Sequence, residues 1–320
     1  MNIINIIVII YLFNFLTFKQ IKKQLIKIKI IIFKNIKMKW LVFGYKGWIG
    51  QQVINILESK YKEHTVITTE IRADDEKNVE KLLQDIQPDR VISLIGRTHG
   101  PGYTTIDYLE QKGKIVENIR DNLYGPLILG LLCKKYNIHY TYLGTGCIFS
   151  GYDEKYTETS SPDFFGSSYS VVKGYTDRLM KQLDEHVLNV RIRMPITSEK
   201  DNVRNFIYKI THYEKICSME NSMTVLPELL PLMIDMAITK QTGTINLTNP
   251  GAITHNDILE MYKEFVDPAF TWQNFSVEEQ DKILLSGRSN NVLETIKLQE
   301  LFPNVKPIKE SIREVLENYK

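Results

Sequence analysis

Cysteine is scarce in this chain of 320 residues, and its three cysteines, Cys133, Cys147 and Cys217, lie far apart. They form no C-x-x-C pair and no evenly spaced set. This pattern excludes a disulfide framework and the usual zinc motifs. We therefore expect a protein of a reducing compartment, the cytoplasm, without a structural metal.

Basic charge is also lacking once the first 37 residues are set aside. The net charge is +2, but residues 1–37 hold seven of the 40 basic side chains and no acid, which leaves 33 basic against 38 acidic side chains, or −5. The folded part therefore offers no electrostatic basis for binding nucleic acid. An apolar content of 43% instead suits a globular protein with one large core, or one core and a smaller lobe.

Residues 1–37 differ in composition from the rest of the chain. Residues 1–18 are an uncharged apolar run with three asparagines, and residues 19–37 are mostly isoleucine and lysine. A signal peptide is excluded because a basic start and small residues at a cleavage site are lacking. A short membrane anchor with the protein on its cytoplasmic side stays open. We favour an extension upstream of the true start at Met38 that is not part of the fold.

From Lys39 onward, apolar runs typical of strands alternate with helical patterns. Such alternation is typical of α/β proteins whose parallel sheet is covered by helices on both faces, the doubly wound or Rossmann arrangement. We expect this domain mainly over residues 38–195, and a smaller lobe mainly over residues 196–320 with some elements returning to the first domain. The predicted strands are residues 40–44, 64–70, 89–96, 138–143 and 187–193. The predicted helices include residues 51–60, 76–86, 254–265 and 308–319, and residues 107–136 are expected to be a long helical region.

Three glycines, Gly44, Gly47 and Gly50, follow the first predicted strand in a G-x-x-G-x-x-G pattern. Glycine at such a turn permits a tight bend and lets a pyrophosphate approach the N-terminus of the next helix. We therefore expect a dinucleotide here, contacted by Gly44, Gly47, Trp48 and Ile49.

Mixed charges follow the second predicted strand, where Arg72 precedes Asp74 and Asp75. An arginine at this place favours the 2′-phosphate of NADP, whereas an acid favours the ribose hydroxyl of NAD. We favour NADPH with Arg72 as a contact, and NADH stays open. Gly96, at the carboxyl end of the third strand, is a further candidate because ligands of such sheets bind at that edge.

Tyr169 and Lys173 form a Y-x-x-x-K pair, which places both side chains on one face of a helix. An ammonium near a phenol favours its anion, so we expect Lys173 to lower the pKa of Tyr169 toward the working pH. Such a group exchanges a proton with a carbonyl oxygen. Thr145 and Cys147 follow an apolar run and should lie where a strand meets a loop.

These features together resemble the extended short-chain dehydrogenase/reductase superfamily. Further segments resemble one of its families, the bifunctional nucleotide-sugar 3,5-epimerase/4-reductase of L-rhamnose synthesis, known from plants and giant viruses. The resemblance covers residues 38 to about 301. The segments are, in order, TGCIF, PDFFGSSYS, RIRMPIT, RNFI, NSMTVLPELLP, TNPG, HNDILEMYKEFVDP, FSVEEQ and RSNN.

The resemblance implies that UDP-4-keto-6-deoxy-D-glucose is epimerised at C3 and C5 and reduced at C4 to UDP-L-rhamnose, with dTDP open as the nucleotide. Thr145 and Tyr169 would bind the C4 oxygen, and Lys173 would also hold the nicotinamide ribose. Cys147 and Lys209 would serve as acid and base on the ring. The C-terminal lobe would bind the substrate, and the candidate contacts are Arg97, Thr98, His99, Arg204, Asn205 and Arg288.

The resemblance also has implications for partners. The plant unit is often fused behind a 4,6-dehydratase, so we expect a separate enzyme of that kind to supply the substrate, and a homodimer stays open. Two other functions remain as alternatives. One is a 4-keto-sugar reductase without epimerase activity, and the other is a catalytically silent regulatory subunit of the same fold.

Overall fold

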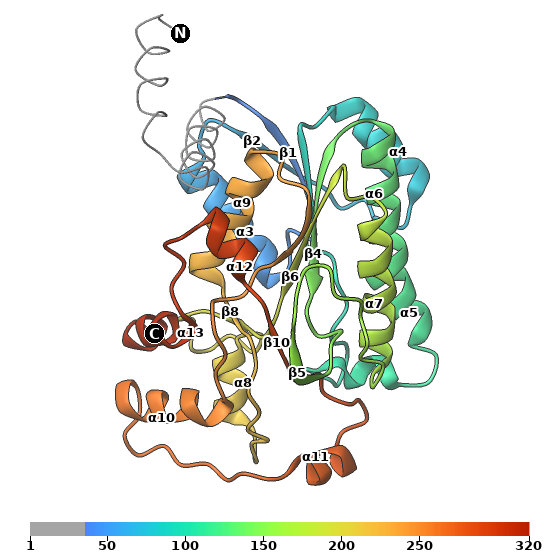
Figure 1. The fold of residues 1–320 in the computed structure, drawn as a ribbon. Coiled ribbons are helices and arrows are strands. Elements are labelled where there is room, and N and C mark those ends of the chain that lie inside the picture. The colour runs from blue at the N-terminus through green and yellow to red at the C-terminus, as the bar shows by residue number, and fades with distance from the viewer. Residues whose placement is uncertain (1–35, 320) are drawn as a thin grey trace, which may run out of the picture.

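The computed structural model describes residues 36–319, and the predicted extension lies outside this range apart from its last two residues. A parallel six-stranded sheet forms the centre of the molecule, with strand order β2-β1-β3-β4-β6-β9 (Figure 1). This confirms the doubly wound sheet and adds a sixth strand from the second half of the chain. The strands are β1 (Lys39–Phe43), β2 (Thr65–Thr68), β3 (Arg90–Ser93), β4 (His139–Thr145), β6 (Val187–Ile192) and β9 (Gly243–Asn246).

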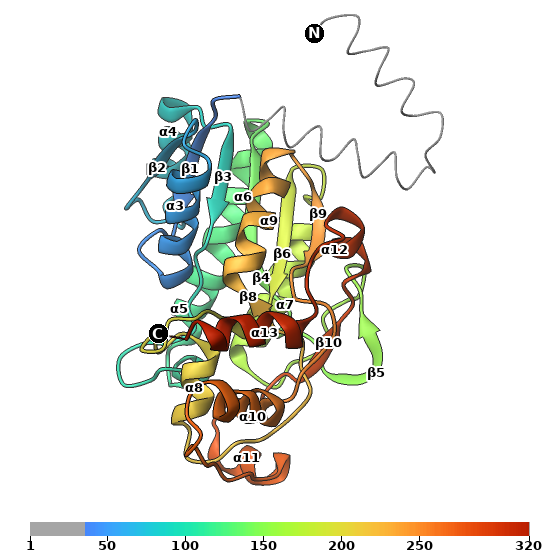
Figure 2. The ribbon, with the colours of Figure 1, turned by 90° about the vertical axis from the view of Figure 1, so that its left-hand side faces the viewer.

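Helices cover both faces of this sheet (Figures 1 and 2). The alternation along β1 explains why: Trp40 and Val42 pack into the core on one face, while Leu41 and Phe43 pack into the core on the other. Each side chain is at most 1% exposed, so the central strand is apolar throughout, as expected of a parallel sheet. The helices are α3 (Trp48–Lys60), α9 (Leu226–Ile238) and α12 (Ile296–Leu301) on the first face, and α4 (Glu76–Ile86), α5 (Ile115–Ile119), α6 (Gly125–Lys135) and α7 (Ser168–Lys181) on the second.

The long helical region predicted over residues 107–136 is largely helical in the structure, but it is divided into several elements. This region consists of the 3₁₀ helix η1 (Ile106–Glu110), α5, the π-helical turn η2 (Arg120–Tyr124) and α6. Gly113, with φ of +82°, lies in the left-handed region between η1 and α5 and interrupts the helix. The wider turn η2 is of a kind often found at functional sites.

The remaining elements form a smaller lobe at the carboxyl ends of the sheet strands (Figures 1 and 2). Three of its helices pack around a separate apolar cluster that includes Ile207, Ile258 and Ile312. The predicted helices at residues 254–265 and 308–319 are both found there, slightly shorter. The lobe contains α8 (Phe206–His212), α10 (His255–Phe265), α11 (Val277–Ile283) and α13 (Ile308–Glu317), with the short parallel pairs β7 (Pro195–Ile196) with β8 (Thr224–Val225) and β5 (Gly151–Tyr156) with β10 (Asn291–Leu293).

A buried ion pair fixes α7 against the sheet. The guanidinium of Arg191 on β6 donates to Asp177 on α7, with Nε–Oδ1 at 2.8 Å and Nη2–Oδ2 at 2.7 Å. Both residues are almost fully buried, and losing one partner of such a pair costs about 3–5 kcal/mol. The pair therefore sets the position of the helix that carries Tyr169 and Lys173.

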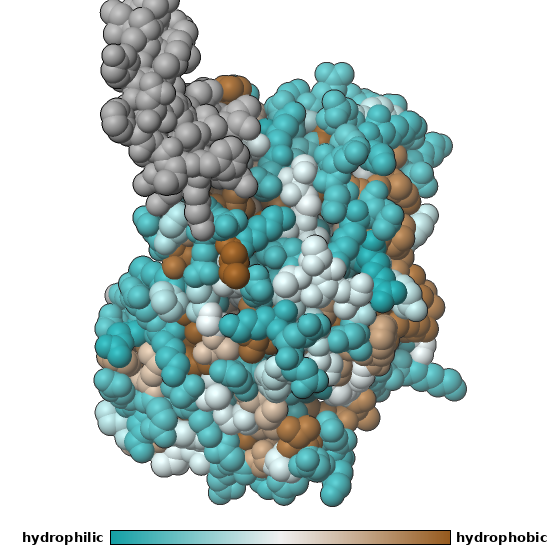
Figure 3. Space-filling model, viewed as in Figure 1, coloured by the Kyte–Doolittle hydropathy of each residue, from teal (hydrophilic) through white to brown (hydrophobic). Residues whose placement is uncertain are grey.

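The surface drawn in Figure 3 is mostly hydrophilic, with apolar side chains along the edge formed by α5, α6 and α7. Val116 on α5, Leu131 on α6 and Tyr175 on α7 are among the exposed apolar residues. Within residues 36–319, no helix has the length and apolar character needed to cross a membrane.

Candidate active site

Two adjoining cavities open at the carboxyl ends of the sheet strands. The loop cavity, of about 430 Å³, is lined by the turn between β1 and α3, by residues 69–74 and by residues 94–97. The central cleft, of about 400 Å³, lies between the sheet and the C-terminal lobe. Gly47 and Gly96 line both, so one elongated ligand can extend from one cavity into the other.

The glycine-rich turn forms the boundary between the cavities. Gly44 has φ of +80°, which favours glycine, and a Cβ on Gly50 would lie 2.3 Å from the Gly44 carbonyl oxygen. These two positions therefore let α3 begin close against the strand. The helix starts at Trp48, three residues before the predicted start, and no side chain caps it. Its N-terminal amides remain available to an anion such as a pyrophosphate.

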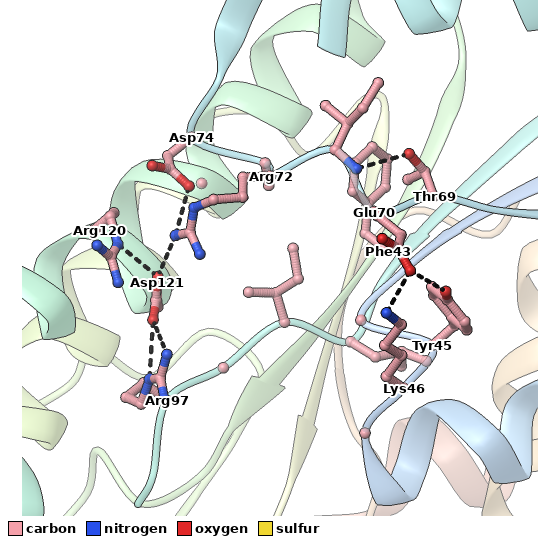
Figure 4. A pocket seen from close by; sticks show the side chains of 18 residues that line it. Phe43, Tyr45, Lys46, Thr69, Glu70, Arg72, Asp74, Arg97, Arg120 and Asp121 are labelled. Carbon is pink, nitrogen blue, oxygen red and sulfur yellow. Dashed lines mark hydrogen bonds and ion pairs between the residues drawn. The ribbon is translucent and has the colours of Figure 1, made fainter. Parts of the chain in front are cut away.

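Charged side chains form two groups on opposite sides of the loop cavity (Figure 4). On one side, Asp121 accepts hydrogen bonds from Arg72 at 2.9 Å and from Arg97 and Arg120 at 3.0 Å each. Their hydrogen bonds hold the pKa of Asp121 below its usual value against the opposing effect of burial. Arg72 also pairs with Asp74 at 2.8 Å. This side of the loop cavity, with three arginines and two aspartates, is therefore basic overall and suits a phosphate.

The second group holds Lys46 and Glu70, which form an ion pair, and Tyr45, whose hydroxyl donates to Glu70 at 3.4 Å. Lys46 comes from the glycine-rich turn, and Glu70 lies two residues beyond the end of β2. A carboxylate at the end of this strand is suited to a ribose hydroxyl. The cavity thus carries features of both NADP and NAD sites, as the mixed charges after the second strand predicted.

The π-helical turn η2 supports the loop that follows β3. The side chain of Asn122 accepts from the Arg97 amide and donates to the Arg97 carbonyl, both at 2.9 Å, and it also donates to Asn118 at 2.8 Å. This two-point contact fixes the backbone beside Gly96. It also directs the Arg97 side chain into the loop cavity, so Arg97 does not line the central cleft where a substrate contact was predicted.

Thr145, Cys147, Tyr169 and Lys173 all line the central cleft. Thr145 is the last residue of β4, and its hydroxyl accepts from the Cys147 amide at 3.1 Å. The hydroxyl of Ser170 on α7 donates to the Cys147 carbonyl at 2.7 Å. The strand end and the helix therefore hold the four side chains in one wall of the cleft.

The expected effect of Lys173 on Tyr169 is wrong in this structure. The Lys173 ammonium donates to the Tyr142 hydroxyl on β4 and lies 3.5 Å from the Leu143 carbonyl oxygen. Burial raises the pKa of Tyr169 far above its usual value, with Cys147 adding to the effect and Thr145 opposing it. Burial also lowers the pKa of Lys173 to about 7, although the charges of Asp177 and Cys147 act to raise it. Tyr169 is accordingly a neutral phenol, which is the form that donates a proton.

Cations from the C-terminal lobe form the opposite wall. Arg204, Lys209 and Arg288 line the cleft together with His99 from the loop after β3. Burial lowers the pKa of Lys209 to about 8, with Arg204 and Arg288 adding to the effect and Cys147 opposing it. Burial lowers the pKa of His99 to about 4, and the nearby cations Arg204, Arg97 and Lys209 add to the effect. This imidazole is therefore neutral near pH 7.

The structure also places four other predicted residues. Thr98, Trp48 and Ile49 line the central cleft. Asn205 does not: it is fully buried and caps α8, and its amide donates to the carbonyls of Thr197 and Glu199 at 2.9 Å each. Its side chain is occupied by the fold, so the predicted substrate contact is corrected to a structural role.

A family model for the RmlD substrate binding domain matches residues 38–218. The chain belongs to this family. A solved UDP-rhamnose synthase from Acanthamoeba polyphaga mimivirus is 58% identical, with a TM-score of 0.86 over 88% of this chain and 100% of that chain. The bifunctional dTDP-4-dehydrorhamnose 3,5-epimerase/dTDP-4-dehydrorhamnose reductase of Arabidopsis thaliana is 40% identical over 281 residues, 85% of this chain and 90% of the relative.

A third relative is a trifunctional enzyme of Arabidopsis thaliana, described as a UDP-glucose 4,6-dehydratase, UDP-4-keto-6-deoxy-D-glucose 3,5-epimerase and UDP-4-keto-L-rhamnose reductase. It is 40% identical over 286 residues, which are 86% of this chain and 41% of the relative. Together these similarities confirm the resemblance to the epimerase/reductases of rhamnose synthesis.

In this RmlD-family chain, several residues in or beside the two cavities escaped the sequence analysis. Lys46 and Glu70 line the loop cavity and had a usable signal, since one lies inside the glycine-rich turn and the other just beyond a strand end. Tyr213, which lines the central cleft, had none. Tyr142 and Asp107 had none either: they line neither cavity and bear on the site only as hydrogen-bond partners of Lys173 and Arg288.

Proposed function

We propose that this protein epimerises UDP-4-keto-6-deoxy-D-glucose at C3 and C5 and reduces C4 with NADPH to give UDP-L-rhamnose. The observation that carries the proposal is the convergence of Thr145, Cys147, Tyr169 and Lys209 on one cleft that continues into the loop cavity. The family and the relatives described above support the same reaction.

The residues present fit a nicotinamide dinucleotide. Gly44 and Gly50 leave room for the backbone to approach a pyrophosphate, the N-terminus of α3 is uncapped, and the basic side of the loop cavity suits a phosphate. The bound cofactor supplies the hydride for C4. Within this chain, Arg72 and Gly96 would hold its adenosine half, and Lys173 its nicotinamide ribose.

NADPH is the proposed cofactor, with NADH as the alternative. The loop cavity is lined by four basic side chains, Lys46, Arg72, Arg97 and Arg120, and three acidic ones. The acid best placed to select NADH, Glu70, is paired with Lys46, which reduces its availability to a ribose hydroxyl. The balance favours a 2′-phosphate.

Reduction needs a proton donor for the oxygen at C4. Thr145 and Tyr169 present neutral hydroxyls from one wall of the cleft, and their hydrogen bonds polarise the carbonyl before the hydride arrives. Tyr169 then gives its proton to the developing alkoxide. Lys173 lies one helical turn further along α7, and its pKa of about 7 lets it receive or release a proton near neutral pH.

Epimerisation needs an acid and a base on the sugar ring. The protons at C3 and C5 are acidic because both carbons adjoin the C4 carbonyl, and Thr145 and Tyr169 stabilise the resulting enolate. Inversion requires reprotonation from the other face. Cys147 follows β4 and Lys209 belongs to α8, so the two come from different walls, and the lowered pKa of Lys209 lets it exchange protons near neutrality.

The diphosphate of the nucleotide sugar would bind the cations of the C-terminal lobe. Arg288 and Arg204 present guanidinium groups, whose fork geometry matches phosphate oxygens. Thr98 and His99 lie on the sheet side of the same cleft, where we place the sugar ring. UDP is preferred to dTDP here because the 58% identical relative is described as a UDP-rhamnose synthase.

We further propose that a separate 4,6-dehydratase makes the substrate, in the cytoplasm. The trifunctional relative described above carries that activity in its own chain, while the match to this protein covers 41% of it. A homodimer is proposed through α5, α6 and α7, because association would cover the apolar side chains exposed there.

Proton exchange at the ring tests this proposal. The protein is incubated in D₂O with UDP-4-keto-6-deoxy-D-glucose, first without NADPH, and NMR follows deuterium entry at C3 and C5. Adding NADPH should then yield UDP-L-rhamnose. Cys147→Ser should slow deuterium entry by roughly 10²–10⁴-fold, the usual loss for an acid–base group, while a substrate already epimerised is still reduced.

The matched control is Cys217→Ser, since Cys217 is a buried cysteine that does not line the cleft. Lys209→Ala should also slow exchange, at one or both carbons. Reduction without any deuterium entry in the parent protein would identify a reductase that acts after another epimerase. Absence of both reactions would identify a silent subunit.

A further inference from the structure

Asp107 in η1 joins the loop after β3 to a segment of the C-terminal lobe about 180 residues further along the chain. The backbone N–H and the hydroxyl of Ser286 donate to its Oδ1 at 2.9 and 2.7 Å, and Arg288 Nη2 donates to its Oδ2 at 2.7 Å. The Thr105 hydroxyl donates to the same Oδ2. Each carboxylate oxygen therefore has two donors.

These contacts hold Arg288 in one orientation. Its Nη1 donates to the Ser286 carbonyl at 2.9 Å and to the Ser286 hydroxyl, while Nη2 is held by Asp107. The Nε–H has no acceptor within residues 36–319, although the side chain lines the central cleft and is 25% exposed. One edge of the guanidinium is thus used by the protein, and donors remain for a ligand.

The ion pair between Asp107 and Arg288 is strong enough to hold the guanidinium in this orientation. Asp107 is buried, and the hydrogen bonds from Arg288, Thr105 and Ser286 together hold its pKa well below the usual range despite burial. The carboxylate is therefore charged at every pH at which the protein would be assayed. A charge-assisted pair with a buried carboxylate keeps one geometry, whereas an exposed ion pair moves between several geometries and is weaker.

We infer that Asp107 is a positioning residue for nucleotide binding: it orients Arg288 so that the free donors of the guanidinium face the β-phosphate of the nucleoside diphosphate. The inference rests on the proposed function for the class of ligand. It goes beyond that function by making the affinity for the β-phosphate depend on a residue that lines neither cavity. Asp107 acts only through Arg288.

Binding of UDP and UMP, measured by calorimetry with NADPH present, tests the inference, because UMP lacks the β-phosphate. In Asp107→Asn, an NH₂ group replaces the oxygen that accepts from Arg288 and cannot accept that hydrogen bond. The remaining oxygen can still accept from Ser286. We expect UDP to bind roughly tenfold more weakly, part of the loss expected for a hydrogen bond to a charged group. UMP should bind within about threefold of the parent, and NADPH binding should be unchanged.

Two further variants separate positioning from general structural damage. Arg288→Ala should weaken UDP binding at least as much, and adding Asp107→Asn to it should cause no further loss, because residues that act through one another are not additive. The control is Glu80→Gln, an acid-to-amide change at an ion-paired carboxylate that lines neither cavity. It should leave both affinities unchanged.

Equal weakening of UDP and UMP by Asp107→Asn, or a further tenfold loss in the double variant, would overturn the inference. If Asp107→Asn loses NADPH binding as well, Arg288→Lys replaces it: that change keeps a positive charge but removes the fork, and unchanged UDP affinity would overturn the inference too. None of these measurements needs turnover. A failure of the proposed reaction in the deuterium experiment is therefore distinguishable from a failure of the Asp107 inference.

Discussion

Replacing Lys173 by methionine should stabilise the protein at neutral pH while removing a group that we propose takes part in reduction. Lys173 is 4% exposed, and its ammonium contacts the Tyr142 hydroxyl and the Leu143 carbonyl. It forms no ion pair with any carboxylate within residues 36–319. Burial lowers its pKa from 10.5 to about 7. Methionine has a similar length and no charge, so it fills the same space without that cost.

The magnitude follows from the two pKa values. In the unfolded chain the side chain is protonated below about 10.5, but in the folded protein it is protonated only below about 7. Between these values the unfolded state binds more protons, so the free energy of unfolding of the parent falls as the pH falls. At about 1.4 kcal/mol per pKa unit, the full effect is roughly 5 kcal/mol, complete near pH 7 and constant below it.

Urea unfolding of the parent and of Lys173→Met without cofactor, from pH 6 to pH 10, measures this effect. The stability advantage of the variant should grow by about 3–5 kcal/mol as the pH is lowered from 10 to 7 and then level off. Lys77→Met, at an exposed position, should show no such trend. An advantage that stays constant across this range would refute the reasoning, because it would mean that burial does not depress the pKa of Lys173.

The remaining predictions concern proton donation and the choice of cofactor. Tyr169→Phe removes the proton donor but keeps the ring, so NADPH oxidation should fall by roughly 10²–10⁴-fold while NADPH fluorescence still reports binding; turnover at the parent rate would contradict the assignment. Glu70→Gln removes a negative charge from the loop cavity and should raise the ratio of kcat/KM for NADPH over NADH roughly tenfold, whereas Lys46→Gln should lower it. Movement of the ratio in the same direction in both variants would show that the ion pair does not govern the choice.

Much of the fold could be predicted because its signals are local. The apolar run that begins at Trp40, the helix at residues 76–86 and the glycine-rich turn at Gly44 each depend on neighbours in the sequence, and each is found where expected. The region 107–136 was predicted as a long helical region, without its internal divisions. The left-handed Gly113 and the π-helical turn η2 divide it, and η2 carries the contact between Asn122 and Arg97, which is made only in three dimensions.

Some residues of the candidate site could likewise be predicted from local sequence features, whereas their contacts could not. Thr145, Cys147 and Tyr169 were identifiable as candidates because a strand end and a Y-x-x-x-K helix are sequence features. Arg288 was identifiable because it lies in the family segment RSNN, and Lys209 because it follows the segment RNFI by two residues. The expected effect of Lys173 on Tyr169 failed because a partner on a neighbouring strand, Tyr142, takes the ammonium.

The sequence by itself determined the elements and the chemistry they carry, since periodicity, glycine positions and reactive side chains are written along the chain. Only the tertiary structure decided which of these groups share an environment. Burial, which depends on the whole fold, sets the pKa of Lys173 and Tyr169 in directions that spacing did not indicate. The contact between Asp107 and Arg288 likewise joins residues 181 positions apart, a separation at which sequence carries no local signal.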